Sequence, residues 1–476
     1  MNQPTIRLKE VALYERDVVL RQPFKFGVIT LRQCPQVFVR ARVEFADGTA
    51  EWGSAAEMLL PKWFDKDPAL TNDDNVDQLR RALVFACEAY LAEERSLTPF
   101  GLHAAHDRAH IERCGTEKLN PLVASFGNAL LDRAVLDAVC HHLGLSFFAA
   151  IQANVPGITN ATAPDLAGMD IGAFLALLNP QAAIAARHTV GLVDAIEDKD
   201  LGKKDRVNDG LPQSLEACAK FYGCTHYKLK VCGNIDGDLD RLRRIAGVLD
   251  RLGRPYVSTL DGNEQYKKVE DVVALWERIA AEPALKKLAA SIVFIEQPIT
   301  RAVALSTSIE PLARCKDVEI DESDAEMGSF LEARRLGYAG VSSKSCKGFY
   351  RSLLNTARCA KWNAEEKTGR YFMSGEDLVV QAGVALQQDL CLATLIGCTH
   401  LERNGHHYVN GLAAYSPDEQ EAFRAAYPDM YHRQDGVVRL RIREGLIDIR
   451  GLDKPGYGTS AVPDWNSMTP AKALKR

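Results

Sequence analysis

The sequence predicts an α/β protein in which a closed barrel of parallel strands and helices is joined to an α+β unit. Three observations lead to this prediction. From about residue 184, short apolar strands alternate with amphipathic helices, as in βα units on a parallel sheet. The preceding part has strands first and helices second. Lysines and carboxylates recur where the predicted barrel strands end, on the face at which barrel enzymes collect their active sites.

The N-terminal part has the pattern of an antiparallel meander followed by helices. In VFVRARVEF (37–45) apolar and polar residues alternate, as expected of a strand with one buried face. ADGT (46–49) predicts a hairpin turn, and a second strand begins near Ala50. Residues 124–144 have apolar side chains at helical spacing and end at Gly144, where a helix-terminating glycine is expected. These elements predict one α+β unit.

Eight strands are predicted after that unit. They are IAARHTVGL (184–192), HYKLKV (226–231), YVSTLD (256–261), SIVFIE (291–296), VEID (318–321), GVSSKS (340–345), YFMS (371–374) and CTHLE (398–402). Helical patterns follow most of them, at 215–223, 238–253, 269–281, 330–337, 350–362 and 380–397. Eight strands with intervening helices favour a closed barrel. An open doubly wound sheet stays an alternative, although no glycine-rich phosphate fingerprint follows an early strand.

The C-terminal part returns to strand patterns, with VVRLRIREGLIDIR (437–450) followed by KPGYG (454–458). We expect a hairpin in this tail to complete the N-terminal unit, which would make the barrel an insertion between its two parts. Residues 151–183 have weak periodicity and predict no defined element.

Composition excludes several classes of protein. The chain has 476 residues, 46% hydrophobic and 25% charged, with a net charge of −5, so it is an ordinary globular sequence without the basic excess of a nucleic-acid or anionic-membrane partner. No apolar run has the length of a bilayer-spanning helix, and MNQPTIRLKE lacks the features of a secretory signal. The twelve cysteines are scattered, without a CxxC pair, which predicts reduced thiols and a cytoplasmic location.

Charged side chains recur at one place in the predicted barrel. Three carboxylates, Asp261, Glu296 and Asp321, end successive strands, and Lys230 and Lys344 stand on the strands before and after them. One such carboxylate alone is more often a helix cap or a turn residue. Three on adjacent strands would repel one another strongly without a cation among them, and hard oxygen ligands suit Mg²⁺.

Two lysines two positions apart, Lys228 and Lys230, point to the same face of their strand. Such a pair is more often a solvated strand face. The alternative is that both ammonium groups share one enclosed site, where each lowers the pKa of the other. The three carboxylates that follow favour this second interpretation.

The ordered set of these motifs resembles the enolase superfamily, and specifically its muconate-lactonizing branch, among proteins of the mandelate racemase/muconate lactonizing enzyme type. The matching motifs are KLK (228–230), LDGN (260–263), IEQP (295–298), IDES (320–323) and SSKSCKG (342–348), and RQPFKFG (21–27), EWGSAAE (51–57) and PGYG (455–458) match in style. The resemblance covers nearly the whole chain. It implies a (β/α)₇β TIM-like barrel with an α+β capping domain, divided as residues 1–155 (N-terminal capping part), 184–410 (barrel) and 411–476 (a segment returning to the cap).

The resemblance also implies roles for individual residues. Lys230 and Lys344 would be acid/base residues on opposite faces of the substrate. The metal ligands would be Asp261, Glu296 and Asp321, holding one Mg²⁺, with Mn²⁺ as the alternative. Supporting roles would fall to Lys228, Asn263 and Glu322. In that family the metal stabilises the enediolate formed when a proton α to a carboxylate is removed, and Lys228 with the cation would keep the lysine base Lys230 neutral.

Three outcomes are compatible with such a site. We expect racemisation or epimerisation of a small-molecule carboxylate, with a syn-elimination lyase (dehydratase) or a cycloisomerase as the alternative from the same lysine pair. A non-catalytic barrel that binds a metal or an anion is the alternative from another class. The sixth and seventh strands lack a histidine, which disfavours the branch that uses a His–Asp dyad, and Glu402 stands where dipeptide epimerases have DxD.

Substrate contacts are predicted from the cap and from the eighth strand, at Phe24, Phe26, Trp63 and Glu402. Lys347 is expected to point away from Lys344, at a turn or a helix start. His406 and His407 are expected to be structural or rim residues, and His188 to be a hydrogen-bonded core histidine. The resemblance further implies a homo-oligomer.

Overall fold

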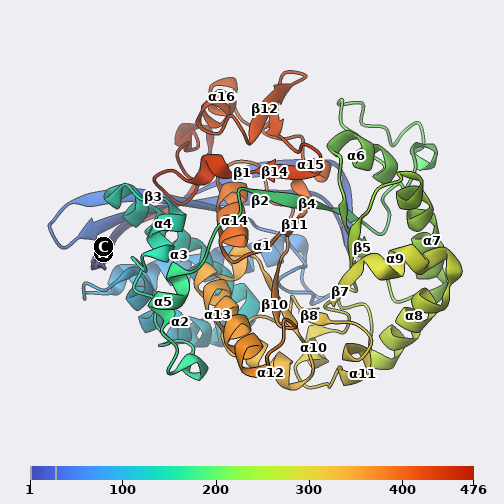
Figure 1. Cartoon of the computed structure of the whole chain (residues 1–476). Helices are drawn as coiled ribbons and strands as arrows, with labels where there is room; N and C mark the ends of the chain where they lie inside the picture. Colours follow the sequence, from blue (N-terminus) through green and yellow to red (C-terminus); the bar gives the residue numbers. More distant parts are fainter. Residues whose placement is uncertain (1–2, 27–28, 476) are drawn as a thin grey trace.

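The computed structural model describes residues 3–26 and 29–475, with the side chains of residues 26, 29 and 472–475 outside that description. A capping sheet lies beside a barrel, and the C-terminal segment runs along both (Figure 1). Within the described residues, no helix combines the length and the apolar character needed to cross a bilayer. All twelve cysteines are unpaired, and only Cys232 and Cys315 are exposed.

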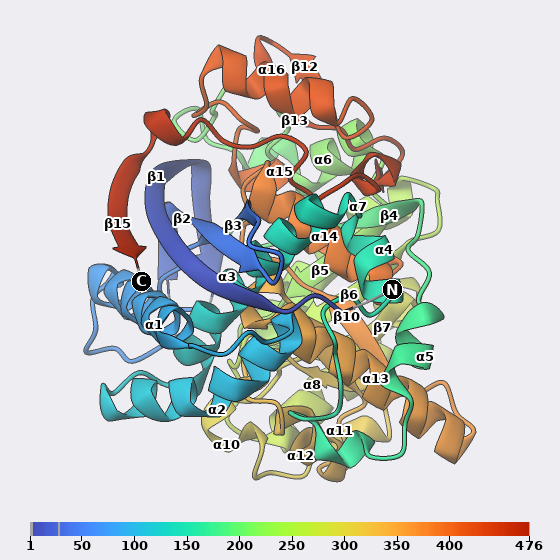
Figure 2. The ribbon, with the colours of Figure 1, turned by 90° about the vertical axis from the view of Figure 1, so that its left-hand side faces the viewer.

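The capping sheet is antiparallel, with the strand order β15-β1-β2-β3. Its strands are β1 (Ile6–Phe26), β2 (Ile29–Phe45), β3 (Ala50–Met58) and β15 (Thr469–Lys475). Three helices pack beside it, α1 (Asn72–Ala92), α2 (Pro99–Thr116) and α3 (Pro121–Leu143) (Figure 2). Because β15 pairs with β1, the C-terminus completes the sheet that the N-terminus begins.

Helix α3 is the core of the cap, and local sequence defines its ends. Asn120 caps its N-terminus, with its side chain accepting a hydrogen bond from the Val123 amide, and Gly144 ends it with φ 64°, as predicted. Gly53 of β3 is required at the contact with α3, since a Cβ there would lie 2.1 Å from the Ala134 carbonyl oxygen. The Asp137 carboxylate accepts hydrogen bonds from the amides of Ser54 and Tyr457, which joins α3 to β3 and to the PGYG tail.

The barrel is closed, as the alternation of strands and helices predicts. Eight parallel strands follow one another in chain order, and the last pairs with the first. They are β4 (Ala183–Val190), β5 (His226–Lys230), β6 (Val257–Asp261), β7 (Ile292–Glu296), β8 (Val318–Ile320), β9 (Gly340–Ser343), β10 (Phe372–Gly375) and β11 (His400–Arg403). The open-sheet alternative is therefore excluded.

Helices surround the barrel and connect it to the cap. Between α3 and β4 lie α4 (Phe147–Gln152), η1 (Pro164–Leu166) and α5 (Ile171–Ala176). Around the barrel lie η2 (Asp198–Asp200), α6 (Leu215–Tyr222), α7 (Ile235–Arg251), α8 (Val269–Ala281), η3 (Pro283–Leu285), α9 (Lys286–Ser291), α10 (Arg301–Ala304), α11 (Glu310–Ala313), α12 (Ser329–Arg335), η4 (Ser345–Lys347), α13 (Phe349–Glu366), α14 (Val384–Leu395) and α15 (Gly405–Tyr408).

Two predicted elements differ from the structure. The helix predicted to begin at residue 380 begins at Val384, because the chain before it forms a buried loop in which Val379 has φ 58° and Gly383 has φ 104°. The hairpin predicted at 437–450 does not join the cap. Its first strand pairs with β12 and its second pairs antiparallel with β4, so the return to the cap is made by β15 instead.

The tail contains α16 (Pro417–Ala426), β12 (Tyr431–Gln434), β13 (Val437–Leu440), β14 (Leu446–Asp448), η5 (Arg450–Leu452) and η6 (Trp465–Ser467). The α16 and β12–β13 elements lie together at one end of the molecule, at the top of Figure 1.

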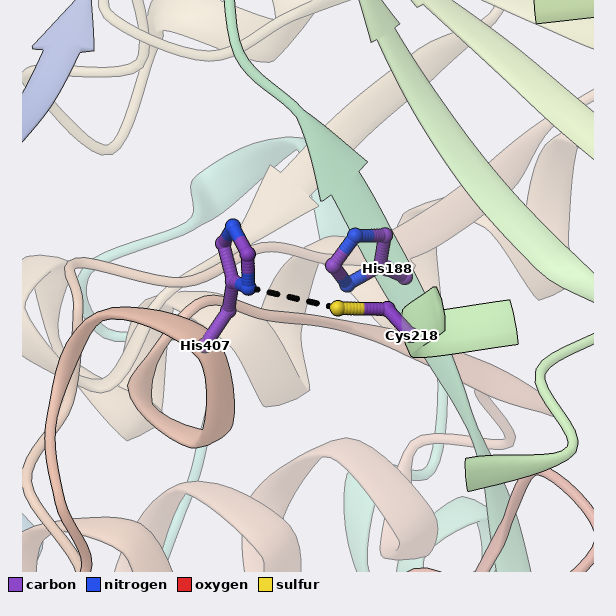
Figure 3. Close-up of side chains that lie close together, drawn as sticks. All are labelled: His188, Cys218 and His407. Carbon is purple, nitrogen blue, oxygen red and sulfur yellow. Dashed lines mark hydrogen bonds between the residues drawn. The ribbon is translucent and has the colours of Figure 1, made fainter. Parts of the chain in front are cut away.

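Strand β4 has buried polar side chains on both faces. Arg187 and Thr189 point into the barrel, where they contact Glu376 and Glu402. His188 points outward, as alternation along a strand requires, and lies beside Cys218 of α6 and His407 of α15 (Figure 3).

Candidate active site at the carboxyl ends of the barrel strands

The five charged residues selected from the sequence lie at one end of the barrel. Lys230, Asp261 and Glu296 are the last residues of β5, β6 and β7, and they are direct neighbours across the parallel ladder. Asp321 and Lys344 follow the last residues of β8 and β9. Because β5 and β9 are the second and sixth of eight strands, their lysines approach the centre from opposite sides of the barrel.

Both lysines of the KLK motif are enclosed. The exposed fractions of Lys228 and Lys230 are 1% and 6%, which excludes the solvated-face interpretation. Lys228 lies at the centre of the carboxylates: its Nζ is 2.9 Å from Asp261 Oδ2, 2.6 Å from Glu296 Oε2, 2.8 Å from Glu376 Oε2 and 3.0 Å from Glu402 Oε2. Burial disfavours the charged ammonium, but these four carboxylates hold the pKa of Lys228 well above its ordinary value.

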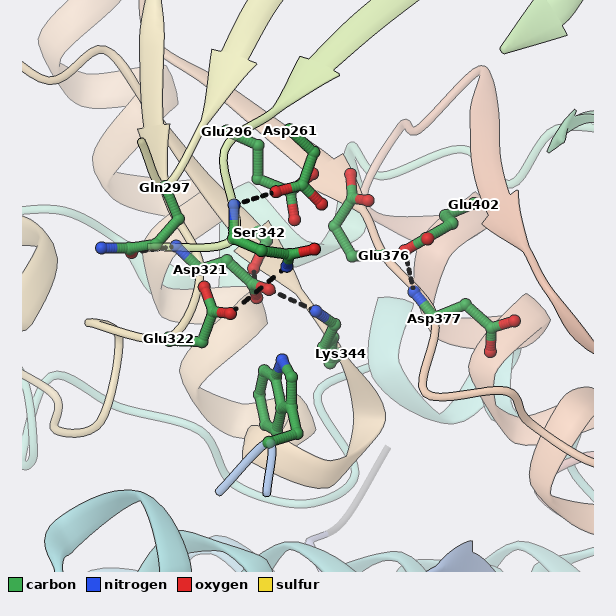
Figure 4. Close-up of polar contacts among 12 residues, drawn as sticks. Asp261, Glu296, Gln297, Asp321, Glu322, Ser342, Lys344, Glu376, Asp377 and Glu402 are labelled. Atoms are coloured by element: carbon green, nitrogen blue, oxygen red, sulfur yellow. Dashed lines mark hydrogen bonds and ion pairs between the residues drawn. The ribbon is translucent and has the colours of Figure 1, made fainter. Parts of the chain in front are cut away.

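Each of the predicted acid/base lysines is paired with one carboxylate. Lys230 Nζ donates to Asp261. Lys344 Nζ donates to Asp321 (Figure 4). Lys344 also lies over the indole ring of Trp63, with Nζ 4.5 Å from the ring centroid. Burial lowers the pKa of Lys344, but Asp321 more than offsets that effect, so its net pKa is raised.

Asp321 is held more tightly than the sequence suggests. Besides Lys344, its side chain accepts a hydrogen bond from Ser342. Lys347 lies behind it, with Nζ 3.6 Å from Asp321 Oδ1 and 3.1 Å from Asp324 Oδ2. Lys347 is in the short helix η4, as expected, but its buried ammonium contributes charge to this carboxylate. These cations hold the pKa of Asp321 below its ordinary value against the effect of burial.

The loop after β3 brings the cap to the same carboxylates. Lys66 forms an ion pair with Glu264, and its Nζ is 3.5 Å from Glu322 Oε1. Asn263, in a left-handed conformation with φ 41°, donates from Nδ2 to the same Glu322 oxygen at 3.5 Å, and its amide donates to Asp261 at 2.7 Å. The supporting residues Asn263 and Glu322 therefore link the DGN turn to the IDES turn and to the cap.

The carboxylates carry more negative charge than the lysines neutralise. Burial raises the pKa of Glu296 well above its ordinary value, and the nearby Asp261 and Glu376 raise it further. The Oε2 atom of Glu322 is buried and makes no hydrogen bond. A divalent cation would balance this excess, and hard oxygen donors are its preferred ligands, so the donor set fits Mg²⁺ at Asp261, Glu296 and Asp321. Their role as its ligands stays a prediction.

A second set of carboxylates shares Glu296 with the first. Oxygens of Glu296, Glu319 and Glu376 lie within 4.8 Å of one another, close enough to hold a cation. However, Arg187 and Lys228 both contact Glu376, so the chain itself supplies positive charge to this set. Burial and Glu376 raise the pKa of Glu319 well above its ordinary value.

A cavity joins the lysines to the cap. It is lined by Lys228, Lys230 and Lys344, and by three predicted substrate-contact residues, Phe24, Trp63 and Glu402. Phe24 is buried with its ring 4.4 Å from that of Tyr408. Glu402 accepts hydrogen bonds from Thr189, Lys228, Asn404 and the Asp377 amide, so it also positions Lys228. The fourth predicted residue, Phe26, has a side chain outside the described part.

The histidines lie apart from the carboxylates. His188, Cys218 and His407 are buried on the outer side of β4, with ligand atoms within 4.8 Å of one another. The Gln22 amide donates to His407 Nε2 at 2.7 Å and to the His407 carbonyl. Neutral His407 therefore carries its proton on Nδ1, the atom 3.4 Å from Cys218 Sγ (Figure 3). His188 Nδ1 is 3.1 Å from His406 Nε2, so this group is a hydrogen-bonded packing cluster.

Several site residues were not predicted from the sequence. Gln297 of IEQP accepts hydrogen bonds from the Asp321 and Ser323 amides, which fixes the position of the IDES turn. Lys66 lies far from the barrel motifs in the sequence, and no local pattern marks it. Glu376 follows β10 directly, so the pattern of a carboxylate after an apolar strand marks this residue as well.

No protein-family model and no curated protein matches this sequence. Solved structures match it over almost its full length. A dipeptide epimerase from Enterococcus faecalis V583, complexed with Mg and the dipeptide L-Leu-L-Tyr, has a TM-score of 0.59 at 14% identity, covering 95% of this chain and 99% of its own. A member of the enolase superfamily from Roseovarius nubinhibens ISM has a TM-score of 0.56 at 16% identity, covering 99% and 100%.

A mandelate racemase/muconate lactonizing protein from Herpetosiphon aurantiacus has a TM-score of 0.54 at 16% identity, covering 92% of this chain and 98% of its own. At these identities the likeness concerns the fold. The fold that the motifs imply is thereby confirmed: this chain has the fold of the enolase superfamily, a closed TIM-like barrel with a capping domain.

Proposed function

We propose that this protein is an enzyme that removes the proton α to the carboxylate of a small-molecule substrate and returns a proton to the opposite face, a racemase or epimerase that depends on Mg²⁺. One observation carries the proposal. Lys230 and Lys344 enter one buried cavity from opposite sides of the barrel, and the three strands between them end in carboxylates. The fold shared with a dipeptide epimerase supports the same class of reaction.

The lysines would act as a base and an acid on the two faces of the substrate carbon. One of them, neutral, accepts the α-proton, and the other, charged, donates a proton from the far side. Asp261 and Asp321 hold the two ammonium groups in position. When bound by Asp261, Glu296 and Asp321, Mg²⁺ would supply positive charge for the substrate carboxylate and replace part of the neutralisation now given by the lysines.

Other residues would exclude water and fix the base. Trp63 covers Lys344 from the cap, and Phe24 closes the same cavity. Lys228, with its pKa held high by four carboxylates, stays charged in the working range of pH and orients Glu402 and Glu376.

The test is isotope exchange with solvent. The protein is incubated in D₂O with Mg²⁺ and mixtures of chiral carboxylic acids, and deuterium at the α-carbon is followed by mass spectrometry. Exchange with an intact carbon skeleton and loss of optical purity is the expected result. Loss of water or ring opening would instead support the lyase or cycloisomerase reaction. Absence of exchange in all mixtures, with Mg²⁺ binding demonstrated separately, would contradict the proposal.

A further inference from the structure

A second pocket lies beside the carboxyl end of the barrel, away from the lysine cavity. It is bounded by α15, by the C-terminal end of α6 and by the β12–β13 hairpin with the residues that follow it. Its volume is about 330 Å³. A concave space of this size accepts a small organic molecule.

Six basic side chains line this pocket. They are Arg403, Arg439, Arg441, Arg443, His406 and His432, and within the described chain no aspartate or glutamate lines it. Arg441 and Arg443 have no carboxylate within 4 Å among the residues that the structure describes, and Arg441 donates only to the Tyr431 carbonyl oxygen at 3.3 Å. Their charge is therefore available to a ligand.

Two buried groups in the lining have unused hydrogen-bonding atoms. Arg403 is 1% exposed, and its Nε and Nη1 atoms make no hydrogen bond. The nearest carboxylate oxygens, of Asp377 and Asp389, are 3.4 and 3.6 Å from Nη1. His406 is 8% exposed, and its Nδ1 atom makes no hydrogen bond. Unsatisfied buried polar atoms are costly, but these atoms are enclosed by protein, so a ligand would meet them only if the wall of the pocket moves.

The positive charge is concentrated rather than scattered. Burial lowers the pKa of His432, and Arg441 and Arg439 both disfavour its protonated form further. Only Arg439 has a carboxylate partner on its own hairpin, Asp435 at 3.2 Å, and that side chain is 59% exposed, where screening by solvent weakens the pair. A pocket of this kind attracts an anion.

The remaining wall is apolar. Phe221 is 47% exposed although it is aromatic, and Tyr222, Leu440 and Ile442 continue the same surface. An inorganic anion would leave this wall in contact with water. An organic anion with an apolar body would cover it while its charged end meets the arginines.

The pocket is separate from the lysine cavity but shares two chain segments with it. Leu378, Val379, Glu402 and Asn404 line the cavity, whereas Val380, Ala382, Arg403 and Gly405 line the basic pocket. The two spaces are thus one layer of residues apart. Asp261, Glu296 and Asp321 do not line this basic pocket, and Arg441 and Phe221 do not line the lysine cavity. The two sites can therefore be probed independently.

We propose that the pocket formed by Arg403, His406, Arg441, Arg443 and Phe221 is a binding site for a small organic carboxylate with an apolar body. The arginine side chains would bind the carboxylate, and Phe221 would cover the apolar part. This proposal stands on the charge and shape of the pocket and does not depend on the reaction proposed above.

The test compares three probes by isothermal titration calorimetry on the full chain: phenylacetate, its neutral amide and inorganic phosphate. We expect phenylacetate to bind, and the amide and phosphate to bind at least about tenfold more weakly. The variant Arg441→Gln/Arg443→Gln should lose at least about tenfold in phenylacetate affinity. Arg441 is only partly buried and Arg443 is exposed, so this variant should fold, which its circular dichroism spectrum would verify.

Two control variants locate the bound probe. Arg433→Gln removes an arginine of the same hairpin that does not line the pocket, and Lys230→Ala alters the lysine cavity; both should keep wild-type affinity. The proposal is overturned if phenylacetate does not bind at about 10 mM, if phosphate binds equally well, or if Lys230→Ala rather than the arginine variant removes binding. The last result would place the probe in the lysine cavity.

Discussion

The two faces of strand β4 carry two buried polar clusters that are stabilised in different ways. On the inner face, Arg187 and Thr189 join a group of lysines and carboxylates held together by ion pairs around Lys228. On the outer face, His188 lies beside Cys218 and His407 and is hydrogen-bonded to His406. The one carboxylate that the described residues bring to this group is Asp194, 3.8 Å from His407 Nε2. Both clusters are equally buried, yet only the inner one brings charge to a cavity.

This difference shows how a buried polar cluster at a reactive site can be distinguished from one that only contributes to packing. Keeping several charges inside a protein is costly unless every charge is compensated, and on the inner face Glu296 and Glu319 are not fully compensated. The outer cluster has no such excess, because burial lowers the pKa of His188 to about 4 and keeps that ring neutral. Uncompensated charge beside a cavity is the sign of a site, whereas a neutral network fits the packing of α6 and α15 on the barrel.

Replacing Lys230 or Lys344 by Ala should give the largest effect on the inner face. Loss of a general base or acid lowers a rate by about 10²- to 10⁴-fold, and we expect that fall in α-deuterium exchange for each variant, with Mg²⁺ binding retained. Lys220→Ala, which alters an exposed lysine of α6 paired with Glu216, is the matched control. A variant of either cavity lysine that exchanges at the wild-type rate would contradict its assigned role.

Replacing Lys228 by Met should give the largest effect on stability. The substitution leaves Asp261, Glu296, Glu376 and Glu402 without their shared cation. Breaking a buried ion pair from one side costs about 3–5 kcal/mol, measured as the change in the free energy of unfolding in urea. Acid should partly restore stability, because protonated carboxylates need no partner. If the variant is as stable as wild type at pH 8, the carboxylates are compensated by another group.

Mg²⁺ should stabilise the folded protein through the inner cluster. At a concentration about 100-fold above its dissociation constant, a ligand of the native state adds about 2.7 kcal/mol, which a rise in the melting temperature would report and EDTA would reverse. Asp321→Asn should abolish this gain, whereas Asp317→Asn, at the opposite end of β8, should keep it. An equal Mg²⁺ effect in both variants would place the cation elsewhere, for example among Glu296, Glu319 and Glu376.

The sequence predicts the inner cluster well because its residues share one structural position. Asp261 and Glu296 end apolar strands and Asp321 directly follows one, and one βα unit separates each from the next, so the closed barrel brings them together. The same regularity predicts the eight strands. The central place of Lys228 is not predictable in this way, because it depends on how deep in the barrel four carboxylates from separate strands meet its ammonium group.

The outer cluster and the cap contacts have no such regularity. His188, Cys218 and His407 come from three distant segments, and only the packing of α6 and α15 on β4 joins them. Lys66 reaches Glu322 from the cap for the same reason. The predicted start of a helix at residue 380 is wrong, because Val379 and Gly383 adopt positive φ angles where the chain passes between the lysine cavity and the basic pocket. Tertiary contacts, which a local pattern does not contain, decide each of these features.

Acid should destabilise the protein through His188. Its pKa is about 6.5 in an unfolded chain and about 4 in the folded one, so its contribution to stability is complete above pH 6.5 and is lost as the pH falls towards 4. At pH 5 the loss relative to pH 7 is about 2 kcal/mol. His188→Asn should lose less stability between pH 7 and pH 5 than wild type by this amount, in urea unfolding at both values. An unchanged slope would show that the pKa of His188 is the same in the folded and the unfolded chain.

The smallest effect should come from Cys218→Ala, which removes one weak acceptor from the outer cluster. Cys218 Sγ receives only the Nδ1–H of His407, whose orientation Gln22 fixes through its other nitrogen. A single hydrogen bond contributes about 1 kcal/mol, and that is the loss we expect in the free energy of unfolding, with α-deuterium exchange and Mg²⁺ stabilisation unchanged. Gln22→Leu should lower the free energy of unfolding by a similar amount, since it removes the hydrogen bond that orients the His407 ring. A loss above about 3 kcal/mol for Cys218→Ala, together with bound zinc in the wild-type protein, would show that the outer face of β4 carries a metal centre of its own. The contrast between a charged inner face and a neutral outer face would then be wrong.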